Sequence, residues 1–316
     1  MGYDIKSIRD EFKAKGVFYT SQELALFLKS FIPSDISEIY DPTCGDGALL
    51  SVFSDDTEKY GQEITGHQLE EARRRLHNFT GVCGDTLKDP AFFGRKFRGI
   101  VANPPFSIAW EPPQSNGLFS DDRFRLAPTL PPRSKADYAF ILHIIHYLAD
   151  DGVAVILGFP GILYRGNREG VIRKWIVEQN YIEKVISIPG DKFVDTKIQT
   201  CALVLRKNKT TTDIEFIDDE KRRSRTAKLE EVAKNDYSLC VSLYIVEEAQ
   251  KEHLDPNLLQ NIARQETLRK LKADIEADEM VCKLEGWSVA PFLDEIIEVA
   301  KEHYPSDGNI TQEATA

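Results

Sequence analysis

The stretch Gly99-Ile100-Val101-Ala102-Asn103-Pro104-Pro105-Phe106 decides the fold of this 316-residue chain. Gly99 to Ala102 form a short apolar run, which is typical of a buried strand, and two prolines stop it directly after Asn103. Because the residue before a proline is held in an extended conformation, we expect Asn103 at the carboxyl end of this strand. In open α/β sheets, that edge is where ligands bind.

The groups at the end of this strand suit a planar ligand that carries an amine. The side-chain amide of Asn103 and the carbonyl of Pro104 can both accept hydrogen bonds from an exocyclic amine. Phe106, which we expect to be exposed, can stack on a planar base. The alternative is a proline-terminated strand with Phe106 in a core, and an isolated Asn-Pro-Pro leaves both interpretations open.

Composition indicates an ordinary globular protein with an acidic balance. Its net charge is −11, so it lacks the overall basic character of a protein that binds nucleic acid alone. If the chain handles nucleic acid, we expect a local basic patch or a partner subunit. No signal peptide is visible, and no apolar run is long enough to span a bilayer. We therefore expect a cytoplasmic protein.

The sequence does not indicate a metal site. Its five cysteines are widely spaced and form no Cys-x-x-Cys pair, which favours neither a disulfide framework nor a zinc site. His143 and His146 lie three residues apart, as metal ligands on a helix do, but no third ligand is nearby. We interpret them as core or surface histidines.

A glycine-containing turn follows another apolar strand. This strand ends at Asp41 and continues into Pro42-Thr43-Cys44-Gly45-Asp46-Gly47, which we expect to open a helix. Glu63 follows Gly47 by sixteen residues, at the expected end of the next strand, where an acidic group suits ribose hydroxyls. The third glycine of the phosphate-binding pattern is replaced by Leu50, which favours a nucleoside without phosphates.

Two further stretches leave a structural and a functional interpretation open. We expect a third strand to end at Asp85, whose carboxylate could accept from an adenine amino group or belong to a turn beside Gly84. Thr20 or Ser21 can cap a helix that follows. The preceding Phe18-Tyr19 either packs under that helix or lines a surface for the amino-acid end of a ligand. Taken alone, the packing interpretation is favoured.

Five short motifs follow one another along the first third of the chain. They are Phe18-Tyr19-Thr20, Asp41–Gly47, Gly61-Gln62-Glu63, Gly84–Leu87 and Asn103–Phe106. In this order they resemble the N6-adenine DNA methyltransferases that depend on S-adenosyl-L-methionine, and more narrowly the modification (M) subunit of type I restriction-modification systems. The agreement continues in Ser134–Phe140, Gly152–Leu157 and 193–200, and it covers about Gly16 to Lys207.

This resemblance implies an α/β fold, the Rossmann-like class I S-adenosylmethionine-dependent methyltransferase fold, with a mostly parallel seven-stranded sheet and an antiparallel last strand. The short connection between the apolar runs 182–188 and 200–205 independently favours an antiparallel hairpin. We expect a methyltransferase domain at 1–210 with a short N-terminal helix, a helical C-terminal extension at 211–305 and a disordered tail at 306–316. In the extension, an apolar stripe through a charged helix suits a partner helix.

The resemblance also implies a role for each motif. The residues assigned to the cofactor are Phe18, Tyr19, Thr20, Asp41, Thr43, Cys44, Gly45, Asp46, Gly47, Glu63, Asp85 and Asn103. The residues assigned to catalysis are Asn103, Pro104, Pro105 and Phe106. Glu63 would hold the ribose and Asp85 the adenine of the cofactor. Asn103 and the Pro104 carbonyl would accept from the target adenine's amine, while Phe106 stacks on the flipped base.

The stretch from 107 to 135 is long for a loop and rich in proline. We hypothesise that it closes over the displaced base or contacts the DNA backbone through Arg123, Arg125 and Arg133, and a surface loop is the alternative. A basic run, 221–228, could contact phosphates or form a solvated loop.

The expected function is transfer of a methyl group from S-adenosyl-L-methionine to the N6 amine of a flipped adenine in DNA. The expected partners are DNA, a separate specificity (S) subunit and a second copy of the chain. The family's usual N-terminal helical domain is missing or cut short, so we expect another polypeptide to recognise the sequence. The alternatives are methylation of RNA or of a protein glutamine, and a non-catalytic assembly role. The catalytic interpretation requires Asn103 to share a cavity with the glycine turn.

Overall fold

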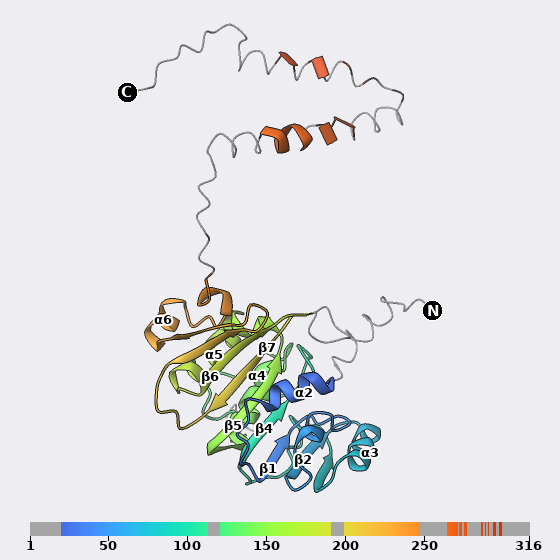
Figure 1. Cartoon of the computed structure of the whole chain (residues 1–316), viewed down its shortest axis with the longest axis vertical. Coiled ribbons are helices and arrows are strands. Elements are labelled where there is room, and N and C mark those ends of the chain that lie inside the picture. Colours follow the sequence, from blue (N-terminus) through green and yellow to red (C-terminus); the bar gives the residue numbers. More distant parts are fainter. Residues whose placement is uncertain are drawn as a thin grey trace. The chain divides into compact units, whose positions relative to one another are not determined.

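The computed structural model describes residues 20–112, 121–190 and 199–246, together with short runs between 264 and 298. The chain divides into two compact units, 1–246 and 247–316 (Figure 1). The expected N-terminal helix, Phe18 and Tyr19, the stretch 193–198 and the tail at 306–316 lie outside the described residues.

A single sheet organises the first unit, and it is built in two halves. The first half contains four parallel strands, β1 (Glu38–Asp41), β2 (Glu58–Glu63), β3 (Phe79–Cys83) and β4 (Phe97–Ala102). The second half contains β5 (Leu148–Gly158), β6 (Ile182–Ile188), β7 (Thr200–Arg206), β8 (Ile214–Asp218) and β9 (Arg223–Ala227). The strand order is β3-β2-β1-β4-β5-β7-β6-β8-β9.

This topology confirms the expected α/β fold class. The strand β7 lies between β5 and β6 and is antiparallel to both, as the short connection predicted. The strand order reverses at β1, which pairs with β2 on one side and with β4 on the other. Ligands of open parallel sheets bind at such a switch point, outside the carboxyl ends of the strands.

Among the described residues the sheet has nine strands, so the expectation of seven is wrong by two. The additional strands are β8, which is parallel to β6, and β9, which is antiparallel to β8. Ile214 and Phe216 alternate inward from β8 and are buried, which gives this strand a place on the core. Part of the basic run forms β9, and the expected boundary at 210 falls inside the first unit.

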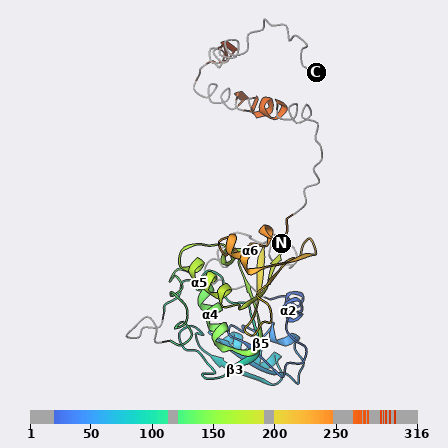
Figure 2. The ribbon, with the colours of Figure 1, turned by 90° about the vertical axis from the view of Figure 1, so that its left-hand side faces the viewer.

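Helices cover both faces of the sheet. They are α2 (Gln22–Lys29), α3 (Gly66–Arg75), α4 (Asp137–Tyr147), α5 (Asn167–Glu178) and α6 (Leu229–Lys234). Figure 2 shows α4 and α5 on one side of the sheet and α2 on the other. Two buried clusters match these layers, one around α4 and α5 and one around α2 and α3. Within the described ranges, every helix is too short or too polar to cross a bilayer.

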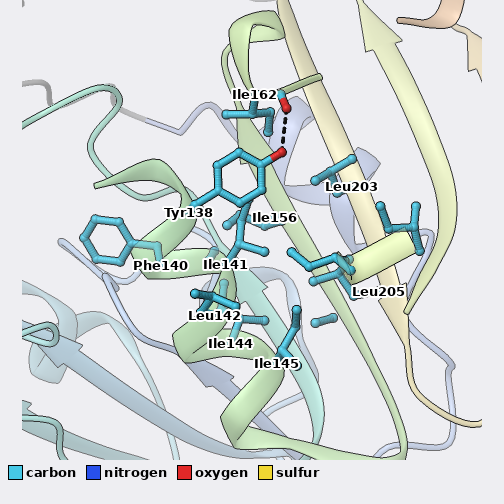
Figure 3. Packing of buried hydrophobic residues seen from close by; sticks show 14 of the residues in the cluster. Tyr138, Phe140, Ile141, Leu142, Ile144, Ile145, Ile156, Ile162, Leu203 and Leu205 are labelled. Atoms are coloured by element: carbon cyan, nitrogen blue, oxygen red, sulfur yellow. Dashed lines mark hydrogen bonds between the residues drawn. The ribbon is translucent and has the colours of Figure 1, made fainter. Parts of the chain in front are cut away.

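The helix α4 is buried on nearly all sides. All of its residues are buried except His146. Figure 3 shows Ile141, Ile144 and Ile145 packed beneath β5 and β7, which bring Ile156, Leu203 and Leu205. The Tyr138 hydroxyl donates to the carbonyl of Ile162 at 2.7 Å, which satisfies its polar atom within this apolar layer (Figure 3).

The expected helix after the glycine turn is a single 3-10 turn, η1 (Leu50–Val52). The polar stretch Ser54-Asp55-Asp56 follows Phe53 directly after this turn. The chain enters β2 at Glu58, so the connection leaves no room for a longer helix.

In the second unit, the described residues 264–270, 272–273 and 275–276 are helical. They include Leu268, one of the residues of the expected apolar stripe, and its side chain is 64% exposed. Leu258, Ile262 and Leu271 lie outside the described residues.

Candidate functional site

A cavity of about 1060 Å³ opens at the switch point of the sheet. Residues at the ends of β1, β2 and β4 and in the turn after β3 contribute to its lining, as does Thr20. The expected site residues that line it are Thr20, Asp41, Thr43, Cys44, Gly45, Asp46, Glu63, Asp85, Asn103 and Pro105. Asn103 and the glycine turn therefore share one cavity, as the catalytic interpretation requires.

The glycine turn is held open by carboxylates that accept backbone N–H groups. Asp41 accepts from the backbone N–H of Thr43 at 2.9 Å, and Glu63 accepts from that of Gly45 at 3.0 Å. Gly45 has a φ of +53°, and a Cβ atom there would meet nothing within 4 Å. This left-handed residue therefore leaves open space at the cavity wall, where a ligand can approach the backbone.

Gly47 serves a different purpose from Gly45. Its φ is +83°, and a Cβ atom would lie 2.7 Å from the Leu76 side chain at the end of α3. Gly47 is absent from the cavity lining, so the structure does not bring it to the site in which we expected it. The glycine is required for helix packing instead.

Glu63 is the last residue of β2, as its spacing predicted, whereas β3 ends at Cys83 and not at Asp85 as expected. The second oxygen of Glu63 accepts from the backbone N–H of Thr65 at 2.8 Å, so both carboxylate oxygens order the chain around them. Asp85 follows β3 by two residues and accepts from the backbone N–H of Leu87 at 2.9 Å. Asp85 therefore belongs to a turn, which was one of the two interpretations of the sequence, and it also lines the cavity, which the other interpretation requires.

The cavity lining is strongly acidic. Five carboxylates line it, from Asp41, Asp46, Glu63, Asp85 and Glu111. Lys88 is the one lysine or arginine among the lining residues that the structure describes. Burial, aided by the nearby Glu63 carboxylate, raises the pKa of Asp41 to about 7. A cationic ligand would stabilise the ionised form of this group, and a polyanionic ligand would not.

Thr20 fixes the amide of Asn103. The side-chain Nδ2 of Asn103 donates to the Thr20 hydroxyl at 3.0 Å, across 83 residues of sequence. This bond orients the amide in the wall of the cavity. The sequence motif placed Thr20 at the cofactor and gave no sign that it supports the strand tip as well.

Phe106 is buried, so the expectation that it is exposed is wrong. Its side chain packs on Phe159 with ring centroids 4.4 Å apart and an interplanar angle of 44°. The chain turns back at Ser107, whose φ is +51°, and the backbone N–H of Ser107 donates to Asp137 at 3.2 Å. Burial of an apolar ring in the core cluster around α2 stabilises this arrangement. Neither Pro104 nor Phe106 is among the residues that line the cavity.

Part of the 107–135 stretch belongs to the site in a way that sequence reasoning missed. Ile108, Ala109, Trp110 and Glu111 line the cavity. Trp110 donates from its backbone to Arg133 at 2.9 Å, and Ala136 donates to Ile108 at 2.8 Å. The proline-rich composition of this stretch gave no sign of these contacts, since it indicated only a loop. Arg123, which we expected to reach toward DNA, is buried instead.

His143 is a core histidine, as expected from the absence of a third ligand. Its ring is fully buried and contacts the Tyr40 hydroxyl at 3.1 Å. Across the residues described here, no three His, Cys, Asp or Glu side chains gather in a group that could hold a metal ion.

Comparison with known proteins agrees with this geometry. The sequence pattern of the N-6 DNA Methylase family matches residues 6–225. The methylase subunit of the type I restriction enzyme MpnII from Mycoplasma pneumoniae is 34% identical, over 84% of this chain and 60% of that protein. The methylase subunit of the type I restriction enzyme MjaVII from Methanocaldococcus jannaschii is 27% identical, over 86% of this chain and 56% of that protein.

A solved structure shows the same arrangement. The methyltransferase subunit of a type I restriction-modification system from Streptococcus thermophilus superposes with a TM-score of 0.65 at 32% identity, covering 72% of this chain and 59% of that one. The chain thus spans about 60% of the length of the first of these relatives. Fold, motif order and sequence pattern agree, and the chain belongs to the N-6 DNA methylase family.

Proposed function

We propose that this chain transfers a methyl group from S-adenosyl-L-methionine to the N6 amine of an adenine in DNA, as the modification subunit of a type I restriction-modification system. The observation that carries the proposal is the shared cavity. Asn103 and Pro105 at the tip of β4 line the same space as the glycine turn, Glu63 and Asp85. A methyl donor and a target amine can therefore meet there.

The residues of the cavity fit S-adenosyl-L-methionine. Its sulfonium and ammonium groups are cationic, and five carboxylates line the cavity against a single lysine among the described lining residues. The backbone N–H of Gly45 is already used by Glu63 at 3.0 Å, so the turn does not offer this amide to a phosphate. The lining thus favours a cationic nucleoside over a nucleotide.

The residues of the glycine turn would hold the cofactor. Glu63 would accept from ribose hydroxyls and Asp85 from the adenine amine, since both carboxylates line the cavity. Thr20 lines the same cavity, and we propose that it lies at the methionine end together with Phe18 and Tyr19. Asp41, Thr43, Cys44 and Asp46 would form the floor.

The strand tip would act on the target base. When bound, S-adenosyl-L-methionine supplies an electrophilic methyl group on a sulfonium centre. The Asn103 side-chain oxygen would accept from the adenine amine and draw its nitrogen toward tetrahedral geometry, which frees the lone pair that the ring otherwise delocalises. Thr20 holds the Asn103 amide in orientation for this task. Acceptance by the Pro104 carbonyl stays a prediction, since Pro104 does not line the cavity.

The target base has to leave the duplex to reach this cavity. Stacking of the extruded base on Phe106 stays a prediction, since the ring packs on Phe159 and does not line the cavity. The apolar ring and the proline pair in any case make the strand tip rigid.

Sequence recognition would come from a specificity subunit. The net charge of −11 opposes autonomous binding to DNA. In the C-terminal extension, the described helical residues at 264–270 carry an exposed Leu268, which suits packing against a partner helix. We propose that the extension contacts the specificity subunit, and that two copies of the chain join one such subunit.

Two measurements test this proposal. Calorimetry should show that the purified chain binds S-adenosyl-L-methionine. Co-expression with its specificity subunit should then give N6-methyladenine in DNA, detected by mass spectrometry of nucleosides, and the Asn103→Ala variant should abolish it. Methylation of RNA or of a protein glutamine would overturn the assigned substrate. Failure to bind the cofactor would favour a non-catalytic assembly role.

A further inference from the structure

Arg123 carries a buried guanidinium and belongs to none of the five sequence motifs. It lies in the segment that follows the Asn103–Phe106 tip, and only 6% of the residue is exposed. Burial of a cation is costly unless all of its donors are satisfied. The neighbouring Phe124 is buried as well and packs on Trp110, which lines the cavity, with ring centroids 5.4 Å apart.

All five N–H donors of Arg123 have an acceptor. The Nε donates to the carboxylate of Asp121 at 3.0 Å, and Nη2 donates to the same carboxylate at 2.6 Å. The other donor of Nη2 reaches the backbone carbonyl of Leu87 at 2.7 Å. The Nη1 group donates to the carbonyl of Thr86 at 2.7 Å and to Nδ1 of His143 at 3.2 Å.

The two carbonyls that Arg123 grips belong to the turn that presents Asp85 to the cavity. Asp85, Thr86 and Leu87 all line the cavity. The Thr86 hydroxyl donates in turn to the carbonyl of Pro42, which opens the glycine turn. Arg123 therefore fastens the turn after β3, and Thr86 connects that turn to the end of β1.

A second connection from Arg123 leads to the same strand end. Because Nδ1 of His143 accepts from Arg123, its proton lies on Nε2, which donates to the Tyr40 hydroxyl at 3.1 Å. Burial and the neighbouring guanidinium hold the pKa of His143 well below its usual range, so the ring stays neutral. Tyr40 directly precedes Asp41 on β1.

We propose that Arg123 is a positioning residue for the cofactor: it fixes the Asp85 turn and the end of β1 against each other, and so sets the width of the cavity. The inference rests on the proposed function, because it names the ligand as S-adenosyl-L-methionine. Lysine cannot replace the guanidinium in full, since one ammonium cannot span two carbonyls, a carboxylate and an imidazole with fixed geometry.

The chain offers a matched control two residues away. Arg125 carries the same charge in the same segment, but its side chain is 61% exposed and pairs with Asp122 on the surface at 3.4 Å. A second control addresses stability alone. Val232 is fully buried on α6, away from the residues that line the cavity, so Val232→Ala destabilises the fold without touching the site.

The test measures the dissociation constant for S-adenosyl-L-methionine by calorimetry, well below the unfolding midpoint of each variant. We expect Arg123→Lys to weaken binding about tenfold, the size that loss of a charge-assisted hydrogen bond gives, and Arg123→Gln to weaken it further. Arg125→Ala and Val232→Ala should bind as the wild type does. In steady-state turnover with the cofactor concentration varied, KM for the cofactor should rise while kcat stays within about threefold.

The outcomes separate the two proposals. If the wild type fails to bind S-adenosyl-L-methionine, the proposed function fails. If the wild type binds and Arg123→Lys binds equally well, or if Val232→Ala with the same loss of unfolding temperature weakens binding as much, the positioning role of Arg123 is overturned. Should Arg123→Gln fail to fold, Arg123→Lys alone decides the question.

Discussion

The two walls of the cavity are built on different physical principles. On the glycine-turn wall, the carboxylates of Asp41 and Glu63 accept backbone N–H groups and leave a negative field in the cavity. On the strand-tip wall, Asn103 is a neutral amide held by the Thr20 hydroxyl, and two prolines stiffen the backbone behind it. The glycine-turn wall carries negative charge, whereas the strand-tip wall supplies a neutral amide with a fixed orientation.

This difference predicts a division of labour. A cationic cofactor gains from the charged wall whether or not a reaction occurs, so changes there should act on its affinity. An oriented amide matters most when the target amine changes geometry, so changes at the strand tip should act on the rate.

Asn103→Ala should have the largest effect. Removal of the side-chain acceptor should lower the rate of methyl transfer at saturating cofactor about a thousandfold, the upper range for loss of one preorganised polar group. Affinity for S-adenosyl-L-methionine should fall less than tenfold. Single-turnover transfer of labelled methyl to DNA measures the first quantity, and calorimetry measures the second. A rate within tenfold of the wild type would contradict the role of the amide.

Glu63→Gln should come next, and should act on affinity. Both carboxylate oxygens accept backbone N–H groups, from Gly45 and Thr65, whereas a glutamine has one oxygen and one amino group. One donor would then face another donor, and binding of S-adenosyl-L-methionine should weaken about thirtyfold. Glu70→Gln on the exposed face of α3 is the control. Unchanged affinity in Glu63→Gln would break the comparison.

Asp41 should give the cofactor affinity a dependence on pH. Burial raises the pKa of its carboxyl to about 7, so the group is mostly protonated at pH 6 and mostly ionised at pH 8. If the cation prefers the ionised form, affinity rises about tenfold between pH 6 and 8, as one titration allows. Calorimetry of wild type and Asp41→Asn at pH 6 and pH 8 measures the affinity for the cofactor. The variant should lose the part of the pH dependence that comes from Asp41.

The same group should affect stability in the opposite direction. Since folding raises the pKa of Asp41, the folded state binds more protons than the unfolded state between about pH 4 and 7. The free energy of unfolding of the cofactor-free chain should therefore fall as pH rises through this window and level off above it. The free energy of unfolding, measured by urea titration at several pH values, should depend on pH differently in wild type and in Asp41→Asn within this window. Parallel pH dependences would speak against a buried neutral carboxyl.

Thr20→Val should have the smallest effect. The valine keeps the shape of threonine but removes the hydroxyl that accepts from Asn103, so the amide loses orientation. We expect a rate decrease of about fivefold at saturating cofactor, the size of one neutral hydrogen bond. Thr20→Ser keeps the acceptor and should remain within about twofold of the wild type. Equal rates for valine and serine would show that the hydroxyl does not support the strand tip.

The sequence predicts the cavity well where hydrophobicity changes abruptly. Asp41 and Asn103 each follow a buried apolar run, and Glu63 was predicted from its distance to Gly47. Parallel strands bring these three strand ends to one edge. The antiparallel position of β7 was predictable for a related reason, because its connection from β6 shows no helical pattern. These features depend on short stretches of chain, which a local pattern describes completely.

The remainder depends on contacts between distant segments. Nothing local distinguishes the buried Arg123 from the exposed Arg125, since the difference arises from the carbonyls of Thr86 and Leu87, more than thirty residues away. Phe106 is equally suited by composition to a core or to a ligand wall, and Phe159 decides between them. The helix expected after the glycine turn is limited to one 3-10 turn, because β2 already begins at Glu58.

The outer margin of the sheet has a consequence for self-association. The terminal strand β9 exposes Arg223, Ser224 and Arg225. Another strand that paired there would have to strip water from the exposed Arg223 side chain and disturb the ion pair between Arg225 and Glu231, so this edge resists growth into fibres. Any protein that binds near this edge is therefore expected to do so through helices or loops, and the β9 edge should stay exposed to solvent.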